Sequence, residues 1–140
     1  MDSYVSKFQQ AITNFKSGMN CAQAVICTYA KELNLDETTA FKIAEGFGGG
    51  MGAGSVCGAL TGVFTLLGLL NSSGSPQNIT KGQTIRLVQS AWKQFEELNG
   101  STLCEVLKGR TGNPPVPCTK CIEDACKLFE KIQLEHQSNK

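Results

Sequence analysis

A glycine-rich stretch that runs directly into an apolar segment is the feature that most restricts how this chain can fold. Residues 45–62 read Glu-Gly-Phe-Gly-Gly-Gly-Met-Gly-Ala-Gly-Ser-Val-Cys-Gly-Ala-Leu-Thr-Gly, and residues 56–70 are apolar almost throughout. Glycines permit positive φ angles and close backbone approach, which predicts a loop at this place. A helix that is apolar all round is buried by its neighbours. We therefore expect a central buried helix over residues 56–70, preceded by a glycine-rich loop.

The remaining chain shows the spacing of apolar residues that is typical of helices. Such patterns predict helices over residues 3–17, 20–33, 37–47 and 80–98, a short helix after residue 101 and a last one from residue 119. No segment alternates as a strand would, and no repeat has the period of a solenoid. The prediction is an all-α fold, a compact bundle of about five to seven helices, in a single domain that spans residues 1–140.

Several residues are expected to begin these helices. Asn20 with Gln23 has the spacing of a capping box, and Asp36 precedes the third helix. We also expect caps at Ser55, at Ser101 or Thr102, and at Thr119. The first helix has an apolar stripe of Val5, Phe8, Ile12 and Phe15. The helix over residues 80–98 has a stripe of Ile85, Val88, Trp92, Phe95 and Leu98. We expect the polar tail from Glu135, with His136, to be solvated.

The formal net charge of +1 gives no electrostatic reason to expect nucleic acid or an anionic membrane as a partner. Residues 59–70 are too few to span a bilayer, and the N-terminal sequence lacks the pattern of a signal peptide. The seven cysteines are an odd number in a chain long enough for its own core, which disfavours a secreted disulfide framework. We therefore expect a cytoplasmic protein whose thiols serve redox chemistry, metal binding or packing.

The cysteines divide according to their predicted positions. Cys21, Cys57 and Cys104 fall in the first turn of a predicted helix, and Cys118 lies just before one. Unpaired N–H groups at a helix start favour a thiolate, so four starts aimed at one point would make a thiolate cluster. The other three, Cys27, Cys121 and Cys126, are interpreted as bystanders.

Other motifs are weak. Cys118-Thr-Lys-Cys121 is a C-x-x-C pair, but no strand precedes it and no second close pair suggests a zinc site. It also lacks the histidine of a haem attachment motif. No haem is therefore expected. No nucleotide is expected either, because the glycine loop lacks the Gly-Lys-Ser/Thr ending of a phosphate-binding loop.

The motifs resemble one known family. They are Asn20-Cys21-Ala-Gln-Ala-Val, Gly46-Phe-Gly-Gly-Gly-Met-Gly, Val56-Cys57-Gly-Ala-Leu-Thr-Gly62, Leu67-Gly68-Leu69, Cys104, and Cys118 before Glu123-Asp124-Ala125. Together they resemble the C_GCAxxG_C_C proteins, which are described as redox-active. A related domain occurs in split-Soret cytochromes, for which an iron–sulfur cluster has been proposed. The resemblance implies that the family's four cysteines are Cys21, Cys57, Cys104 and Cys118.

Three functions follow as hypotheses. The first is electron transfer by an iron–sulfur cluster, [2Fe–2S] or [4Fe–4S], bound by Cys21, Cys57, Cys104 and Cys118 with the backbone of Gly49, Gly50 and Gly58 around it. The second is thiol–disulfide or persulfide chemistry, with Cys57 and Cys21 as the reactive pair. The third is binding of a thiophilic metal such as zinc or copper(I). The redox partner is unknown, and the glycine-lined apolar helix would also suit a homodimer interface.

Overall fold

The computed structural model describes residues 6–138, which form seven α-helices connected by short turns and loops. The helices are α1 (Phe8–Lys16), α2 (Cys21–Tyr29), α3 (Glu37–Ala44), α4 (Gly58–Asn71), α5 (Lys81–Asn99), α6 (Cys104–Leu107) and α7 (Cys118–Ser138), with 3₁₀ turns at Lys31–Leu33 and Glu45–Phe47. Between residues 6 and 138 the only β pairing is one antiparallel bridge, Val56 with Leu103. The all-α prediction is confirmed, and the helix count lies within the predicted range.

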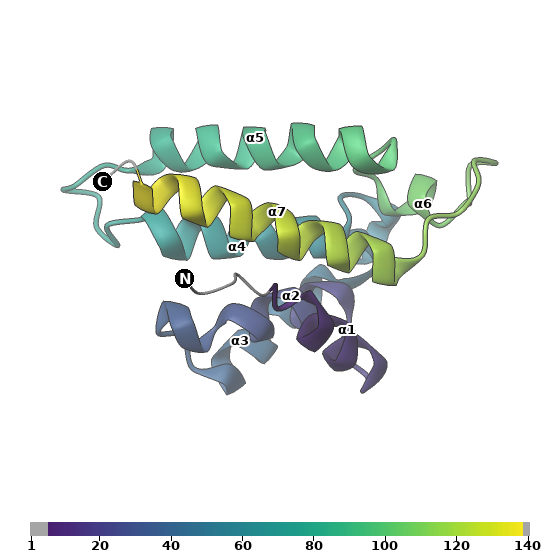
Figure 1. Cartoon of the computed structure of the whole chain (residues 1–140), viewed down its shortest axis with the longest axis horizontal. Helices are drawn as coiled ribbons and strands as arrows, with labels where there is room; N and C mark the ends of the chain where they lie inside the picture. The colour runs from purple at the N-terminus through teal and green to yellow at the C-terminus, as the bar shows by residue number, and fades with distance from the viewer. Residues whose placement is uncertain (1–5, 139–140) are drawn as a thin grey trace, which may run out of the picture.

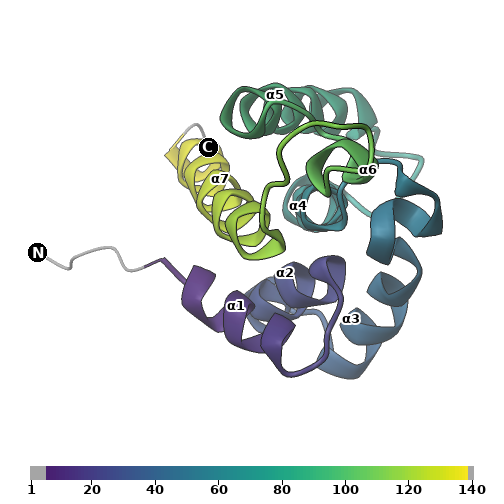
Figure 2. The ribbon, with the colours of Figure 1, turned by 90° about the vertical axis from the view of Figure 1, so that its right-hand side faces the viewer.

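The helices form two groups that meet at α4. Figure 1 shows α4, α5 and α7 running alongside one another, with α1, α2 and α3 beneath them. Both α4 and α7 begin at the end of the molecule where α6 lies, and Figure 2 looks onto that end. α4 packs against α2, α5 and α7. The starts of α4, α6 and α7 are thereby gathered at one end of the fold.

α4 is the central buried helix, as the sequence predicted. Its apolar side chains Leu60, Val63, Leu66 and Leu67 are fully buried. Gly62 allows α2 to approach closely, because a Cβ at this position would lie 3.1 Å from the Cβ of Val25. Fully burying one aliphatic side chain contributes about 1.5–3 kcal/mol, so this helix is a major source of stability.

The helix boundaries differ from the predicted ones at several ends. α1 begins at Phe8, and the predicted contribution of Val5 lies outside the described residues. α2 ends at Tyr29 and α3 at Ala44, and each is followed by a 3₁₀ turn rather than by more α-helix. Gly100, in the left-handed conformation, ends α5.

The predicted apolar stripe of α5 is only partly buried. Phe95 is fully buried, but Trp92 is 36% exposed and its ring stacks on Phe64 with centroids 6.3 Å apart. Ile85 and Leu98 are also exposed. Only part of the predicted stripe therefore belongs to the core, because α5 lies at the side of the bundle and packs mainly against α4 and α7.

The C-terminal turn of α7 is packed rather than solvated. His136 is buried, and its Nε2 lies 3.0 Å from Asn71 Oδ1 at the end of α4. The prediction of a solvated histidine in a frayed tail is wrong, because α7 continues to Ser138 along the full length of α4.

Among residues 6–138, no helix has both the length and the apolar character that a membrane crossing requires.

Candidate functional site

The start of α2 fixes Cys21 and also anchors the glycine loop. The predicted capping box is present: Asn20 Oδ1 accepts from the N–H of Gln23, and the Gln23 side chain accepts from the N–H of Asn20. Asn20 Nδ2 also donates to the Glu45 carbonyl at 3.0 Å. A Cβ on Gly48 would lie 2.6 Å from that nitrogen. Only glycine therefore lets the loop pass directly over the first turn of α2.

Positions 49 and 50 of the loop are occupied by glycine for different physical reasons. Gly50 has φ +65° and is buried, and a Cβ there would lie 2.6 Å from Ser55 N and 2.7 Å from Cys104 Cβ. Gly49 has φ +66°, but a Cβ there would meet nothing within 4 Å. Gly50 is required by both conformation and space, whereas Gly49 is favoured by conformation alone.

The loop brings Cys57 and Cys104 together through backbone pairing. The Cys57 N–H donates to the Thr102 carbonyl at 2.8 Å, and the Cys104 N–H donates to the Ser55 carbonyl at 2.6 Å. Cys57 is the N-cap of α4, and Cys104 is the first residue of α6. The predicted caps at Ser55 and at Ser101 or Thr102 are wrong, because residues 55–57 and 102–104 pair with each other and each helix starts only after this bridge.

Gly58 places the start of α4 against the start of α2. A Cβ there would lie 3.1 Å from the Phe47 carbonyl oxygen, 3.3 Å from Ala22 N and 3.4 Å from Cys21 Cβ. A side chain would therefore push α4 away from Cys21.

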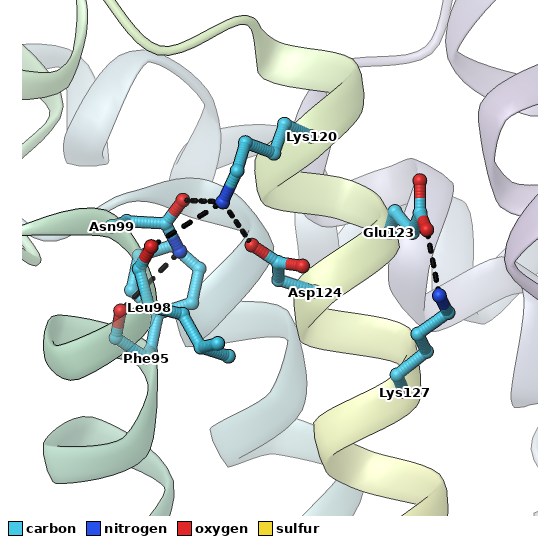
Figure 3. Close-up of polar contacts among 7 residues, drawn as sticks. All are labelled: Phe95, Leu98, Asn99, Lys120, Glu123, Asp124 and Lys127. Atoms are coloured by element: carbon cyan, nitrogen blue, oxygen red, sulfur yellow. Dashed lines mark hydrogen bonds and ion pairs between the residues drawn. The ribbon is translucent and has the colours of Figure 1, made fainter.

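The first turn of α7 carries Cys118 and Cys121. Helix α7 begins at Cys118 itself, so the predicted cap at Thr119 is wrong and Thr119 is already helical. Lys120, between the two cysteines, points to α5: its Nζ donates to the Leu98 carbonyl, Asn99 Oδ1 and Asp124 Oδ2 (Figure 3). These contacts tie the start of α7 to the end of α5, which orients the cysteine-bearing turn.

Cys21 and Cys118 form the first hydrogen-bonded thiol pair, and both side chains are half-buried. The Cys21 thiol donates to the Cys118 sulfur, which lowers the pKa of Cys118 to about 6 against the opposing effect of burial; the Lys108 charge and the backbone N–H of Cys118 add to the lowering. The same hydrogen bond, burial and the neighbouring sulfur raise the pKa of Cys21. One thiolate and one thiol therefore face each other at neutral pH.

Cys57 and Cys121 form the second pair, which is almost fully buried at 5% and 2% exposure. The Cys121 thiol donates to the Cys57 sulfur, and this bond lowers the pKa of Cys57 while it raises that of Cys121. The backbone N–H groups of Ala59 and Leu60 in the first turn of α4 lower the pKa of Cys57 further. This is the effect expected at a helix start.

Cys104 lies beside both pairs without joining either. Burial raises its pKa, and it is close enough to feel the charges of Cys57 and Cys118. Lys108, one turn after Cys104, favours the thiolates of Cys21, Cys104 and Cys118. Lys108 was not among the predicted site residues, although its spacing of four residues from Cys104, about one helical turn, was a usable signal.

The structure thus places all four selected cysteines, Cys21, Cys57, Cys104 and Cys118, at helix starts in one region of the fold. It adds Cys121, which the sequence analysis had set aside. Cys121 lies three residues after Cys118, so both project from one face of α7 toward the other cysteines. The C-x-x-C spacing was the signal that could have included it.

Cys27 and Cys126 lie outside this cluster. Cys27 is buried in the middle of α2. Cys126 contacts the Tyr29 hydroxyl, and burial raises its pKa to about 12. Its neighbour Glu130 accepts hydrogen bonds from Tyr29 at 2.5 Å and from the N–H of Lys7 at 2.9 Å. That these two cysteines are bystanders stays a prediction.

The cysteines in this region bear on whether the implied iron–sulfur cluster would fit here. Within residues 6–138, no three His, Cys, Asp or Glu side chains surround a common point that would hold a metal ion. The sulfurs pair two by two instead, Cys21 with Cys118 and Cys57 with Cys121. The arrangement as it stands does not fit a shared metal centre.

The fold and this site define a class: an all-α protein that gathers several thiols at the starts of its helices. The chain belongs to the C_GCAxxG_C_C family, whose description is "Putative redox-active protein", and the family model matches residues 19–132. The matched region includes every cysteine of the cluster. Neither the comparison with curated proteins nor the comparison with solved structures found a match.

Proposed function

We propose that this redox-active protein works by thiol–disulfide exchange, with Cys118 as the attacking thiolate and Cys21 as its partner. The observation that carries the proposal is that two half-buried cysteines, from the starts of α2 and α7, face each other. The hydrogen bond between them lowers the pKa of Cys118 to about 6. An attacking thiol is most effective when its pKa lies near or below the ambient pH, because the thiolate is the nucleophile. The proposed setting is the cytoplasm, where unpaired thiols stay reduced.

The exchange is balanced without any bound cofactor. The Cys118 thiolate attacks one sulfur of an external disulfide and releases the other sulfur as a thiolate. Cys21 then loses its proton to that leaving thiolate and attacks Cys118, which closes the Cys21–Cys118 disulfide and releases the second external sulfur. The external disulfide gains two electrons and the protein loses two.

Serine variants test this proposal. Wild-type protein mixed with glutathione disulfide should release glutathione, whereas Cys118→Ser should lose this fast reaction and Cys21→Ser should accumulate a mixed disulfide on Cys118. Cys27→Ser is the matched control, because Cys27 is a buried cysteine outside the cluster, and it should react like the wild type. Unchanged rates in Cys118→Ser would contradict the proposal.

The second candidate is an iron–sulfur cluster on Cys21, Cys57, Cys104 and Cys118. What favours it is that these cysteines lie on four separate segments beside a glycine loop, and that the charges of Cys57 and Cys118 act on both Cys21 and Cys104. Ligation would require both hydrogen-bonded pairs to open. Iron, sulfide, zinc and copper analysis of anaerobically purified protein tests this candidate, together with the related one of a thiophilic metal.

Two variants separate the candidates. Cys104→Ser would remove a cluster ligand, but it leaves both thiol pairs intact. Cys121→Ser would leave the four proposed ligands, but it removes the second pair. Loss of bound iron in Cys104→Ser and not in Cys121→Ser would favour the cluster, whereas iron-free protein with active Cys118 favours thiol–disulfide exchange.

A further inference from the structure

The two thiol pairs differ sharply in their access to solvent. Cys21 and Cys118 are half-buried, whereas Cys57 and Cys121 are 5% and 2% exposed. A disulfide carried by another molecule must bring a sulfur into line with the attacking sulfur, so it can reach the first pair far more readily than the second. We call Cys21 with Cys118 the outer pair, and Cys57 with Cys121 the inner pair.

The two pairs are also adjacent. Cys118 and Cys121 are one turn apart on α7, and Gly58 holds the start of α4, with Cys57, against Cys21. The charge of the Cys118 sulfur acts on Cys57 and on Cys121, and that of Cys57 acts on Cys21. The two pairs are therefore neighbours at the starts of α4 and α7, with the buried inner pair next to the half-buried outer pair.

We infer that the outer and inner pairs form a disulfide relay, in which the outer pair exchanges with an external disulfide and then passes its disulfide to the inner pair. This inference rests on the proposed function of the outer pair and extends it. The external partner is any thiol or disulfide that can contact the half-buried sulfurs, and the inner pair is a store for two further electrons.

The transfer is balanced within the protein. Starting from a Cys21–Cys118 disulfide, the Cys57 thiolate attacks Cys118, forming a Cys57–Cys118 disulfide and releasing Cys21 as a thiolate. Cys121 gives its proton to Cys21 and attacks Cys57, closing the Cys57–Cys121 disulfide and releasing Cys118. The outer pair gains two electrons, the inner pair loses two, and Cys118 is again free to attack another external disulfide.

The relay explains why both pairs have the same asymmetry. In each pair one sulfur accepts both the partner's thiol hydrogen bond and at least one backbone N–H at a helix start, and the other cysteine holds the proton. After transfer, the outer pair regains this arrangement, with the proton on Cys21. Cys121 thereby has a role, which is to close the inner disulfide with Cys57, although the resemblance to the family did not include it among the four shared cysteines.

The order of oxidation tests the relay in the full-length reduced protein. Samples oxidised with glutathione disulfide are quenched with acid, alkylated and mapped by peptide mass spectrometry. The wild type should form the Cys21–Cys118 disulfide first and the Cys57–Cys121 disulfide later. In Cys118→Ser the inner disulfide should form about tenfold more slowly or not at all. Cys21→Ser serves as the second variant, Cys27→Ser as the control, and circular dichroism verifies that each is folded.

The relay is overturned if the inner disulfide forms at the wild-type rate in both outer-pair variants, if it forms before the outer one, or if it never forms. These outcomes are distinct from failure of the proposed function. A reversible Cys21–Cys118 disulfide with an inner pair that stays reduced removes the relay alone. Absence of the Cys21–Cys118 disulfide removes both.

Discussion

The Cys21 and Cys118 side chains, which begin two different helices, share a hydrogen bond that joins the start of α2 to the start of α7. Far apart in the sequence, they meet because both α2 and α7 pack against α4. The bond leaves the proton on Cys21 and favours the thiolate of Cys118, so the helix packing itself determines which sulfur is reactive.

The first prediction concerns the pKa of Cys118. In the wild type, alkylation of Cys118 by iodoacetamide should rise with pH around a midpoint of about 6. Cys21→Ala removes the hydrogen-bond donor, which destabilises the thiolate, so the midpoint should move up toward the ordinary cysteine value of about 8.5. Peptide mass spectrometry across a pH series measures both midpoints.

Lys108→Met supplies a second arm for that measurement. The charge of the wild-type Lys108 favours the Cys118 thiolate less than the hydrogen bond from Cys21 does. The midpoint for Cys118 should therefore rise by a smaller amount in Lys108→Met than in Cys21→Ala. A midpoint that stays in place in both variants would show that neither contact sets the reactivity of Cys118.

The second prediction compares two neighbouring glycines with nearly equal φ angles. Gly49→Ala should destabilise the protein by about 1 kcal/mol, because only the left-handed conformation opposes it. Gly50→Ala also forces a Cβ against Ser55 N and Cys104 Cβ, so we expect an additional loss of about 1–3 kcal/mol. Urea unfolding of both variants gives the comparison, and equal losses would refute the close approach at Gly50.

The third prediction concerns Asn20. Asp36→Ala removes an ordinary helix cap, whose side chain accepts from the N–H of Thr39, and should cost about 1 kcal/mol. Asn20→Ala removes a cap and also the contact to the Glu45 carbonyl, so about 2 kcal/mol is expected. Only Asn20→Ala should also increase the alkylation rate of Cys57, since it loosens the loop over the cluster. If the two variants lose the same stability, Asn20 is no more than a cap.

The fourth prediction concerns the buried carboxylate of Glu130. Tyr29→Phe keeps the ring, which packs edge-on against Phe129 with centroids 4.9 Å apart, but removes a donor to Glu130. Loss of a hydrogen bond to a buried charged group should cost about 1.5–3 kcal/mol in the free energy of unfolding. Thr39→Ala, which removes an exposed hydroxyl contact to Asp36, should change stability by less than about 0.5 kcal/mol. Comparable losses in the two variants would contradict this role for Glu130.

Local patterns predicted the parts of the fold that depend on local contacts. The Asn20–Gln23 capping box, the Asp36 cap and the burial of the helix around Leu60–Leu67 follow from neighbouring residues and from composition. The position of Cys57 as the N-cap of α4 does not, because it depends on the distant pairing of Val56 with Leu103.

The same distinction holds for the site. Helix-start positions selected Cys21, Cys57, Cys104 and Cys118, and the structure places all four at such positions. The hydrogen-bond partners of these cysteines could not be predicted from local sequence, because Cys121 meets Cys57 only where α7 packs on α4. The same packing of α7 on α4 buries His136. The pairings that decide the chemistry are therefore tertiary contacts.

The most direct test of the account is to equilibrate the reduced protein in dithiothreitol buffers of increasing oxidising strength and to map the disulfides by peptide mass spectrometry. A reversible Cys21–Cys118 disulfide should appear as a two-electron step, with Cys27 and Cys126 remaining thiols throughout. It would be contradicted if Cys21 and Cys118 remained thiols, or each joined a different cysteine, over the whole range.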